Sequence, residues 1–401
     1  MPLIETNDTA VTMPIQIVLL EHDDVDGLYP FSATHCAWEL RIGAFTIAER
    51  WARSLQGSTV AFISHRARHL ASFVERYRHT SSYLQVPTLF ISGNVLVSPT
   101  VMKQVAAACS ESSSPILFYC AGHPVGTFLP TPAAEASGVS AAIDSLDPDS
   151  VLSIEIMGHA IHRLWHVFDH IERAIGWDSE LITSDLASSA SVHPTAVIDS
   201  SRGPVIVMEG AEVGAFSYVA GPTVIGPDAK VKPHSSIRHS VIGPASRVGG
   251  EISESIIHAY SNKQHDGFLG HSYLCEWVNL GAGTTTSNLK NTYGTVRVHM
   301  PWGDEDSQRT FLGSLIGDHS KSAIGTLFST GTICGISSNV VSSDLAPKSI
   351  PSFSWLTSGE RESYDVDKAL TVAATVMSRR DVVLGPATAD LLRSLHSDND
   401  A

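Results

Sequence analysis

The chain has few of the features that mark secreted or membrane proteins. Its five cysteines include no pair at Cys-x-x-Cys spacing, which favours reduced thiols in the cytoplasm over disulfides or a zinc site. The first twenty residues lack a basic segment followed by a long apolar one, so they predict no signal peptide. No apolar run approaches the roughly 18 residues that cross a bilayer. We therefore expect a cytoplasmic protein with no membrane partner.

Basic residues are also scarce. The 401 residues include 26 Lys and Arg against 41 Asp and Glu, which gives a net charge of −15. Without a basic stripe we expect no nucleic-acid partner, and an anionic substrate would require a local basic pocket. A hydrophobic content of 43% with 17% charged residues indicates a folded protein, and the length favours two domains.

The first half alternates short apolar runs with segments of helical periodicity. This alternation predicts an α/β domain with a largely parallel sheet. A helical stripe from Ile161 to Ala174 closes this half, and a polar, serine-rich linker follows it. Strands are expected at Ile15–Leu20, Val60–Ile63, Leu89–Ser92 and Ile116–Cys120, and helices at Gly43–Leu55, Arg66–Tyr77 and Pro99–Ser110.

The second half has a period of six. Small aliphatic residues recur at this spacing from Val207 to Ile237, and the pattern resumes from Ile316 to Val340. Neither a helix nor a simple strand has this period; it is the hexapeptide repeat of a left-handed parallel β-helix. The flat walls of such a coil favour packing against further copies, so we expect a homotrimer with ligand grooves between subunits.

The tail from Glu360 to Leu395 returns to helical spacing, broken at Gly385-Pro386. We expect it to cap the open end of the β-helix. The predicted division is therefore an α/β domain over 1–183, a β-helix over 184–356 and a helical segment over 357–401.

The segment HDGFLGHSYLCEWVNLGAGTTTSNLKN, residues 265–291, interrupts the apolar ladder with polar groups. Its histidine, Gly-Ala-Gly turn and two asparagines resemble, without a gap, the acetyltransferase domain of the bifunctional N-acetylglucosamine-1-phosphate uridylyltransferase/glucosamine-1-phosphate acetyltransferase family. The resemblance implies acetyl transfer from acetyl-CoA to the amine of an amino-sugar phosphate. Such an amine must lose a proton before it attacks a thioester, and a neutral imidazole accepts that proton readily near pH 7.

By this resemblance His265 is the catalytic base, and Asn279 and Asn288 bind the sugar or the acyl group. The turn around Ala282 offers backbone N–H groups to a developing oxyanion. Ser314 matches a position near the thioester. The basic residues that grip the sugar phosphate in the family have no direct match, and the nearby substitutes are Lys263, Lys290, Arg297 and Lys321.

Structural interpretations remain open beside these functional ones. A histidine at a β-helix corner is often a solvated turn residue, and Asn279 has the spacing of a corner residue that stacks along the coils. Three histidines, His258, His265 and His271, raise the alternative of a zinc site, but their spacing does not match the β-helical carbonic anhydrases.

The N-terminal half resembles a divergent bacterial group of sugar nucleotidyltransferases, through LYPFSAT at 28–34 and ELRIGAFTIAERW at 39–51. The same group shares AYSNKQHDGFLG and SNLKNTYG in the second half. The resemblance implies a Rossmann-like nucleotidyltransferase-type fold and a sugar phosphate or nucleotide sugar as substrate. Nucleotidyl transfer needs a glycine-rich loop, a basic residue and a carboxylate for Mg²⁺. Here the loop is acidic; Arg41 remains as a phosphate contact, and Asp23 and Asp24 are either Mg²⁺ ligands or a solvated acidic turn.

Two classes of function follow. The first is a sugar-phosphate transferase in which acetyl transfer at the β-helix is better supported than nucleotidyl transfer in the N-terminal domain. The second is a non-catalytic scaffold that binds a sugar nucleotide through a degenerate N-terminal domain. A third alternative is a nucleotidyltransferase whose β-helix serves only to assemble the oligomer.

Overall fold

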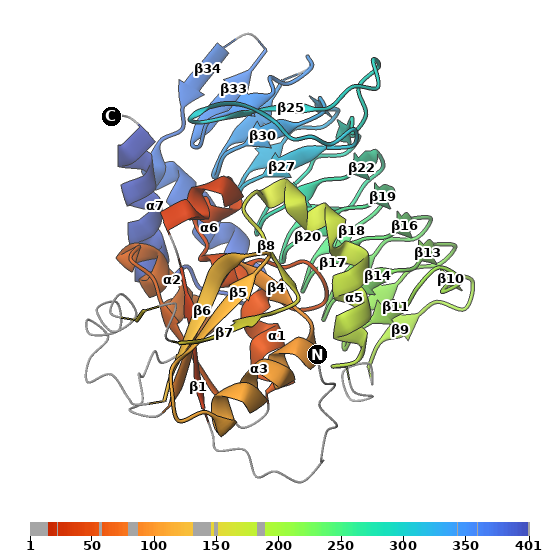
Figure 1. Cartoon of the computed structure of the whole chain (residues 1–401). Coiled ribbons are helices and arrows are strands. Elements are labelled where there is room, and N and C mark those ends of the chain that lie inside the picture. Colours follow the sequence, from red (N-terminus) through yellow and green to blue (C-terminus); the bar gives the residue numbers. More distant parts are fainter. Residues whose placement is uncertain are drawn as a thin grey trace. The chain divides into compact units, whose positions relative to one another are not determined.

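The computed structural model describes residues 15–21, 23–55, 58–78, 87–130, 146–147, 151–182, 189–342, 344–358 and 360–399 (Figure 1). The chain divides into two compact units, and neither is continuous in sequence. The first comprises Met1–Leu20, Ala48–Ile63 and Thr80–Ala160, and the second comprises Glu21–Ile47, Ser64–His79 and Ile161–Ala401. The three consecutive domains expected from the sequence stay a prediction. The two units are each assembled from separate segments of the chain, so they do not test those domain boundaries.

The first unit is built on a six-stranded sheet of order β2-β1-β3-β6-β5-β7. β1 is parallel to β2 and β3, whereas β6 is antiparallel to β3 and β5. The expected largely parallel sheet is therefore a mixed one. Its strands, with the separate pair β4 and β8, are β1 (Gln16–Leu20), β2 (Thr59–Ile63), β3 (Thr88–Ser92), β4 (Val95–Val97), β5 (Ile116–Cys120), β6 (His123–Leu129), β7 (Leu152–Glu155) and β8 (Gly158–Ala160).

The antiparallel strand β6 was not predicted because its turn is inconspicuous in the sequence. Cys120 pairs with His123, so the hairpin loop is Ala121-Gly122, and both residues have positive φ, at 52° and 76°. Two such residues define the type I′ turn that suits a hairpin, but the usual signal is Asn-Gly or Asp-Gly. Alanine in the first position hides that signal.

Most of the expected helices of this half are confirmed within a few residues. α3 begins with Pro99 in its first turn, and the Ser98 hydroxyl accepts a hydrogen bond from the Val101 N–H at 3.2 Å. The helix expected over 161–174 is instead a 3₁₀ helix followed by an α-helix, separated at His170, whose φ of −122° is not helical. The helices are η1 (Asp23–Leu28), η2 (Phe31–Ala33), η3 (Ala37–Glu39), α1 (Ile47–Ser54), α2 (Ala67–Tyr77), α3 (Pro99–Glu111), η4 (Leu164–Asp169) and α5 (Ile171–Ser179).

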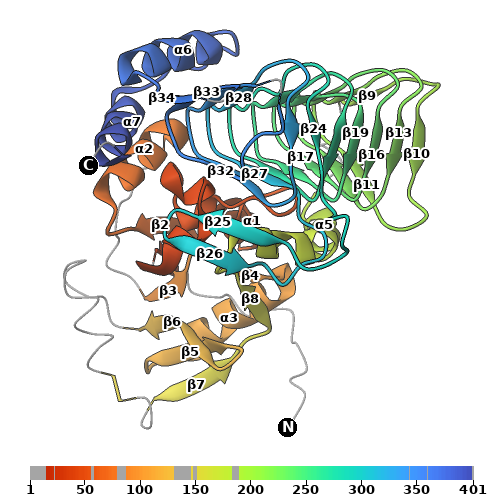
Figure 2. The ribbon, with the colours of Figure 1, turned by 90° about the horizontal axis from the view of Figure 1, so that it is seen from above.

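The second unit contains the predicted parallel β-helix, whose short strands stack coil upon coil (Figure 2). Its first face consists of β9 (Ser191–Val192), β12 (Glu212–Val213), β15 (Lys230–Val231), β18 (Arg247–Val248), β21 (Asn262–Lys263), β28 (Lys321–Ser322), β31 (Asn339–Val341) and β33 (Ser354–Thr357). The second face consists of β10 (Val197–Asp199), β13 (Tyr218–Ala220), β16 (Ser236–Arg238), β19 (Glu251–Ser253), β22 (Phe268–Gly270), β24 (Thr285–Thr286) and β29 (Leu327–Phe328). The third face consists of β11 (Val205–Val207), β14 (Thr223–Ile225), β17 (Val241–Ile242), β20 (Ile256–Ile257), β23 (Tyr273–Leu274), β27 (Ser314–Ile316), β30 (Thr332–Cys334) and β32 (Ser349–Ile350).

The six-residue period predicts the core of the coils correctly. The aliphatic side chains of the repeat point inward and form one continuous buried cluster that runs from Ala211 to Leu356. We call the turns between the first and second faces the first corner, those between the second and third faces the second corner, and those between the third and first faces the third corner. The coil is interrupted once, at the second corner, by a long excursion that contains the hairpin β25 (Arg297–Met300) and β26 (Gly303–Asp306).

The third corner turns on a column of residues with left-handed backbone. Tyr260, Trp277, His319 and Ser337 have φ between 53° and 61°. The rings of Tyr260 and Trp277 stack at 4.3 Å, and Trp277 and His319 stack at 6.3 Å. Adjacent coils lie about 4.8 Å apart, which suits stacked aromatic rings, so side-chain stacking offsets the steric cost of this backbone conformation in residues other than glycine.

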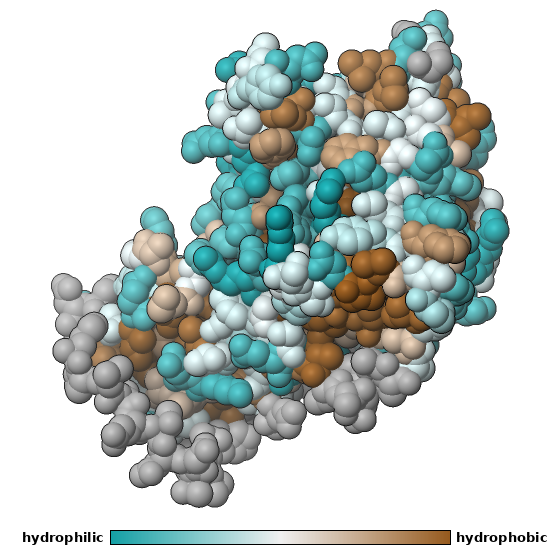
Figure 3. All heavy atoms as spheres, turned by 90° about the vertical axis from the view of Figure 1, so that its right-hand side faces the viewer, coloured by the Kyte–Doolittle hydropathy of each residue, from teal (hydrophilic) through white to brown (hydrophobic). Residues whose placement is uncertain are grey.

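The two ends of the stack differ. The first coils expose large apolar side chains, and Figure 3 shows an apolar patch on the side of the molecule where β9 to β11 lie in Figure 1. At the other end β34 (Glu360–Ser363) pairs antiparallel with β33, so the edge is completed by a strand where helical spacing was expected. The helices α6 (Val366–Ser378) and α7 (Pro386–Asn399) follow and pack against Ile336 and Phe353 of the third corner.

Candidate active site at the first corner

His265 lies exposed in the first-corner turn between β21 and β22. The next coil runs 17 residues ahead: Asn262 bridges to Asn279, and the Gly267 Cα lies against the carbonyl of Thr284. The same offset places Ala282 opposite His265. Because adjacent coils are about 4.8 Å apart, the histidine and the Gly-Ala-Gly turn are neighbours, as the sequence predicted.

The turn around Ala282 has backbone donors to spare. Thr284 N–H bonds the Gly281 carbonyl at 3.1 Å, and the Ala282 carbonyl accepts from Gly325 N–H at 2.7 Å. Within the described part of the chain, no acceptor bonds the N–H groups of Ala282 and Gly283. Two adjacent free N–H groups are the donors that stabilise a developing oxyanion.

Lys263 does not present its charge to solvent. Its side chain is 2% exposed, and the ammonium donates to the carbonyls of Gly249 at 2.9 Å, His265 at 2.7 Å and Asp266 at 3.2 Å. Burial lowers the pKa of Lys263 to about 8, and the Asp266 carboxylate opposes that shift. All three ammonium protons are therefore used by backbone oxygens, and binding of a ligand phosphate would have to displace one of them.

Asn279 lies three residues before Ala282, exposed on the first face. Its backbone bridges Asn262 of one coil and Lys321 of the other, so these side chains form a polar column along the face. Lys321 donates to the His319 carbonyl at 2.7 Å, and burial lowers its pKa to about 8. The structure thus brings Asn279 close to the first-corner turn.

Asn288 lies instead at the second corner, on the far side of the second face. Its Nδ2 lies 3.0 Å from Nδ1 of His271, whose ring stacks on Phe311 at 5.2 Å. Burial, reinforced by the Arg309 charge, lowers the pKa of His271 to about 4, so this imidazole is neutral at pH 7. An amide N–H donates to Nδ1, which puts the ring proton on Nε2. Sequence analysis considered His271 only as a zinc ligand, and its pairing with Asn288 had no sequence signal.

The remaining β-helix candidates also lie away from His265. Lys290 follows Asn288 and donates to the Thr295 carbonyl at 3.1 Å. Ser314 begins β27 on the third face and is fully buried, and its N–H donates to the Ser272 hydroxyl at 2.9 Å. Within one copy of the chain, the first corner therefore gathers His265, Lys263, Ala282 and Asn279, but not Asn288, Lys290 or Ser314.

Of the N-terminal candidates, Arg41 is the one whose side chain the structure describes. Arg41 is 4% exposed, and its guanidinium donates to the Ala44 carbonyl. Glu21, which begins the acidic loop, accepts hydrogen bonds from Arg66 at 2.6 Å and from the Ala37 N–H at 2.8 Å. The side chains of Asp23 and Asp24 lie outside the described residues. The described part of the chain holds no group of three His, Cys, Asp or Glu side chains arranged for a metal ion, which applies to both Mg²⁺ and the zinc alternative.

The second unit contains a buried charge network that was not predicted from the sequence. Nε2 of His35 lies 2.9 Å from Asp318 and its Nδ1 lies 3.0 Å from Glu39, and Arg76 of α2 approaches Glu39 at 2.7 Å. His258 joins it, 3.2 Å from Glu276 and 2.9 Å from the Glu39 carbonyl. The network fastens η3 and α2 to the third corner.

The pKa values in this network follow from mutual pairing. Burial alone would lower the pKa of His35, but the Asp318 and Glu39 carboxylates outweigh it and raise that pKa to about 10. Burial alone would raise the pKa of Glu39, but Arg76 and His35 bring it down to about 2. The charges are thus fixed at neutral pH.

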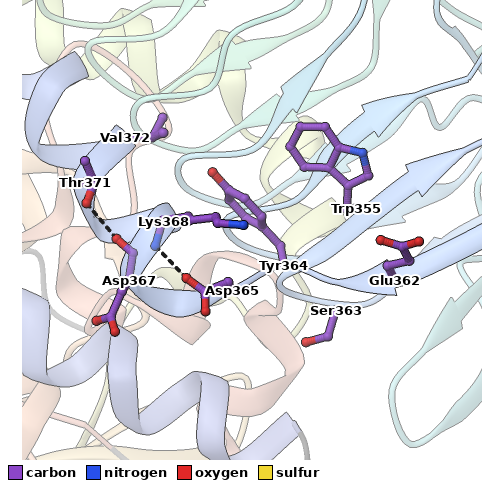
Figure 4. A pocket seen from close by; sticks show the side chains of 9 residues that line it. All are labelled: Trp355, Glu362, Ser363, Tyr364, Asp365, Asp367, Lys368, Thr371 and Val372. Atoms are coloured by element: carbon purple, nitrogen blue, oxygen red, sulfur yellow. Dashed lines mark hydrogen bonds between the residues drawn. The ribbon is translucent and has the colours of Figure 1, made fainter.

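A hollow lies where α6 follows β34 (Figure 4). Its volume is about 710 Å³, and the rings of Trp355 and Tyr364 are 5.4 Å apart on one side. Figure 4 shows the Asp367 carboxylate pointing away from Trp355, and Asp365 accepts a hydrogen bond from the Lys368 N–H as the N-cap of α6. The polar groups do not converge, so we assign no reaction to this hollow.

Comparisons with known proteins agree with both resemblances. Residues 17–186 match a family described as sugar nucleotidyl transferase. A bifunctional sugar-1-phosphate nucleotidylyltransferase/acetyltransferase of Sulfurisphaera tokodaii is 31% identical over 137 residues, which is 33% of this chain and 34% of that protein. The bifunctional protein GlmU of Corynebacterium jeikeium is 26% identical over 221 residues, 52% of this chain and 45% of that one.

These matches span less than half the length of either relative. The alignment with the solved UDP-N-acetylglucosamine acyltransferase of Francisella novicida covers 53% of this chain and 86% of that protein at 12% identity, but a TM-score of 0.26 supports neither fold nor function.

None of the helices in the described ranges has the length and hydropathy that crossing a bilayer requires. Over the matched parts the chain is similar to the sugar nucleotidyltransferases and to the bifunctional nucleotidylyltransferase/acetyltransferase proteins.

Proposed function

We propose that the chain transfers an acetyl group from acetyl-CoA to the amine of an amino-sugar phosphate at the first corner of its β-helix. The observation that carries this proposal is the placement of the exposed His265 imidazole opposite a turn whose Ala282 and Gly283 N–H groups are free. A base beside two unpaired backbone donors is the arrangement that acyl transfer to an amine requires.

The amine that attacks is the neutral form, which has already released its extra proton to solvent. As its lone pair attacks the thioester carbonyl carbon, the amine passes a second proton to His265. The Ala282 and Gly283 N–H groups donate to the oxygen that becomes negative. The C–S bond then breaks, His265 returns the proton to the leaving thiolate, and the products are an amide and free CoA.

His271 does not serve as this base. Its Nδ1 already accepts from Asn288, which leaves the proton on Nε2, and the low pKa of about 4 makes the ring a weak base. A candidate base must be able to accept a proton near the working pH. His265 is exposed and has no such partner among the described residues.

Nucleotidyl transfer is the weaker proposal. The family match over 17–186 supports it, but Arg41, the expected phosphate contact, donates to the Ala44 carbonyl. The described residues offer no set of ligands for Mg²⁺, and we derive no step through that ion.

The separation of the candidate residues supports an oligomeric site. His265 lies at the first corner of one coil and Asn288 at the second corner of the next coil. The second face separates them, and a three-residue strand of that face such as β22 spans about 10 Å at 3.3 Å per residue. A homotrimer of such prisms would bring the second corner of one copy to the first corner of the next. We propose this assembly, with Asn288 and Lys290 completing the site of a neighbour.

The test is release of CoA from acetyl-CoA with glucosamine 1-phosphate as acceptor. His265→Ala should lower kcat about 10²- to 10⁴-fold, the usual contribution of a general base. His234→Ala is the matched control, because His234 is an exposed histidine of the same corner two coils earlier. Turnover that is absent from the native protein, or that survives His265→Ala, would sink the proposal.

A further inference from the structure

Lys263 occupies a position that the hexapeptide ladder gives to valine. Along the first face the inward-facing register runs Val213, Val231, Val248, Lys263. A lysine in this apolar column carries a cost of burial, visible in the lowered pKa. Packing therefore does not explain its presence, and the explanation must lie in what its ammonium contacts.

The ammonium spans two coils. One bond goes to the Gly249 carbonyl of the preceding turn, and two go to the carbonyls of His265 and Asp266 in the turn that presents the candidate base. No backbone N–H of the described residues bonds either of the latter two oxygens. The lysine thus gives these two carbonyls a hydrogen-bond donor that the described backbone does not supply.

Besides Lys263, a hydrogen bond from the Glu251 N–H to the Gly267 carbonyl at 3.3 Å supports the turn. Gly267 has a φ of 103°, a conformation that residues with a side chain rarely adopt, and it packs against the Thr284 carbonyl. His265 and Asp266 are both exposed, so their side chains do not anchor the loop. The Lys263 ammonium anchors the corner from inside, through its bonds to the His265 and Asp266 carbonyls.

We propose that Lys263 is a positioning residue for His265: it holds the backbone of the histidine turn against the preceding coil, so that the imidazole faces the Ala282 turn. This inference rests on the proposed acetyl transfer. The lysine does not touch the reacting atoms; it acts through the histidine. Small displacements of a catalytic group cost about 100-fold in rate per ångström.

The experiment compares Lys263→Met, which keeps the length of the side chain without its donors, with Lys232→Met, an exposed lysine at the same corner two coils earlier. Lys263→Met should lower kcat about 10- to 100-fold and leave KM for acetyl-CoA unchanged, because binding groups are untouched. Lys263→Gln keeps two N–H donors and should recover part of the loss. Methionine suits the apolar column, so the variant should fold.

The ring resonances of His265 give a readout that does not depend on turnover. In Lys263→Met the His265 signals should shift or broaden, and those of His234 should not. If native protein and Lys232→Met lack turnover, the proposed function fails, and the His265 signals alone decide the positioning role. Unchanged His265 signals, or kcat within twofold of native in Lys263→Met, would overturn the inference.

Discussion

Nε2 of His35 lies 2.9 Å from the Asp318 carboxylate, across 283 positions of sequence, and both side chains are buried. Asp318 also accepts a hydrogen bond from the Thr34 hydroxyl at 2.7 Å and from the Glu276 N–H at 2.7 Å. The pair therefore joins the segment between η2 and η3 to the third corner of the β-helix.

Replacing Asp318 by Asn should destabilise the fold strongly. The change keeps the size of the side chain but leaves the buried His35 charge without its carboxylate, a loss of about 3–5 kcal/mol in unfolding free energy. Urea unfolding measures it. Glu305→Gln is the contrasting control: it breaks the pair with Arg163 at 2.7 Å, but both side chains there are partly exposed, so the loss should stay near 1 kcal/mol or below. Equal losses for the two variants would contradict the assigned importance of the buried pair.

The same network predicts how stability depends on pH. The pKa of His35 is raised to about 10, so its stabilising charge is fully present below about 6.5 and is lost as pH rises toward 10. The pKa of Glu39 is lowered to about 2, so its contribution is present above about 4.5 and is lost as pH falls toward 2. Unfolding free energy should therefore decline on both sides of a plateau at about pH 5–6.

The control for that profile is His35→Gln, which removes the titrating group. This variant should be less stable on the plateau, and its decline between pH 7 and 10 should be flatter than that of the native protein. A native profile that rises steadily from pH 6 to 10, or an unchanged alkaline slope in the variant, would show that His35 is not the source. Unfolding midpoints in denaturant across the pH range provide the measurement.

The repeat made the β-helix predictable, and the same regularity explains what stayed hidden. A period of six fixes which side chains point inward, so the core from Val213 to Val340 follows from the sequence. Periodicity does not explain a residue that departs from the repeat for a local reason. Lys263 was therefore predicted to bind a ligand, because it lies near His265 in the sequence. Its inward direction follows only from the register with Val248.

Long-range pairing explains the other misses. His35 and Asp318 carry no mutual signal in one sequence, because the contact depends on how η3 and the third corner fold together. The separation of His265 from Asn288 also follows from the geometry of the β-helix. The two residues are 23 positions apart in a string that resembles one motif, but they lie at different corners, at opposite ends of the second face.

That separation yields a decisive test of the assembly. Co-expression of His265→Ala and Asn288→Ala chains with different tags, followed by purification through both tags, gives mixed oligomers. If a site takes His265 from one copy and Asn288 from the next, every mixed trimer has one complete site out of three, because an Asn288→Ala chain is followed by a His265→Ala chain once around the ring. The mixture should recover that fraction of native turnover, while each variant alone stays low.

A site contained in one copy predicts a different result, because every chain in the mixture then lacks one of the two residues and no complete site forms. Light scattering on the same preparation should give three times the mass of the chain. Recovery without a trimer would point to another oligomer with the same shared site. Absence of recovery in a verified trimer would return Asn288 to a structural role, as the residue that holds the neutral ring of His271 at the second corner.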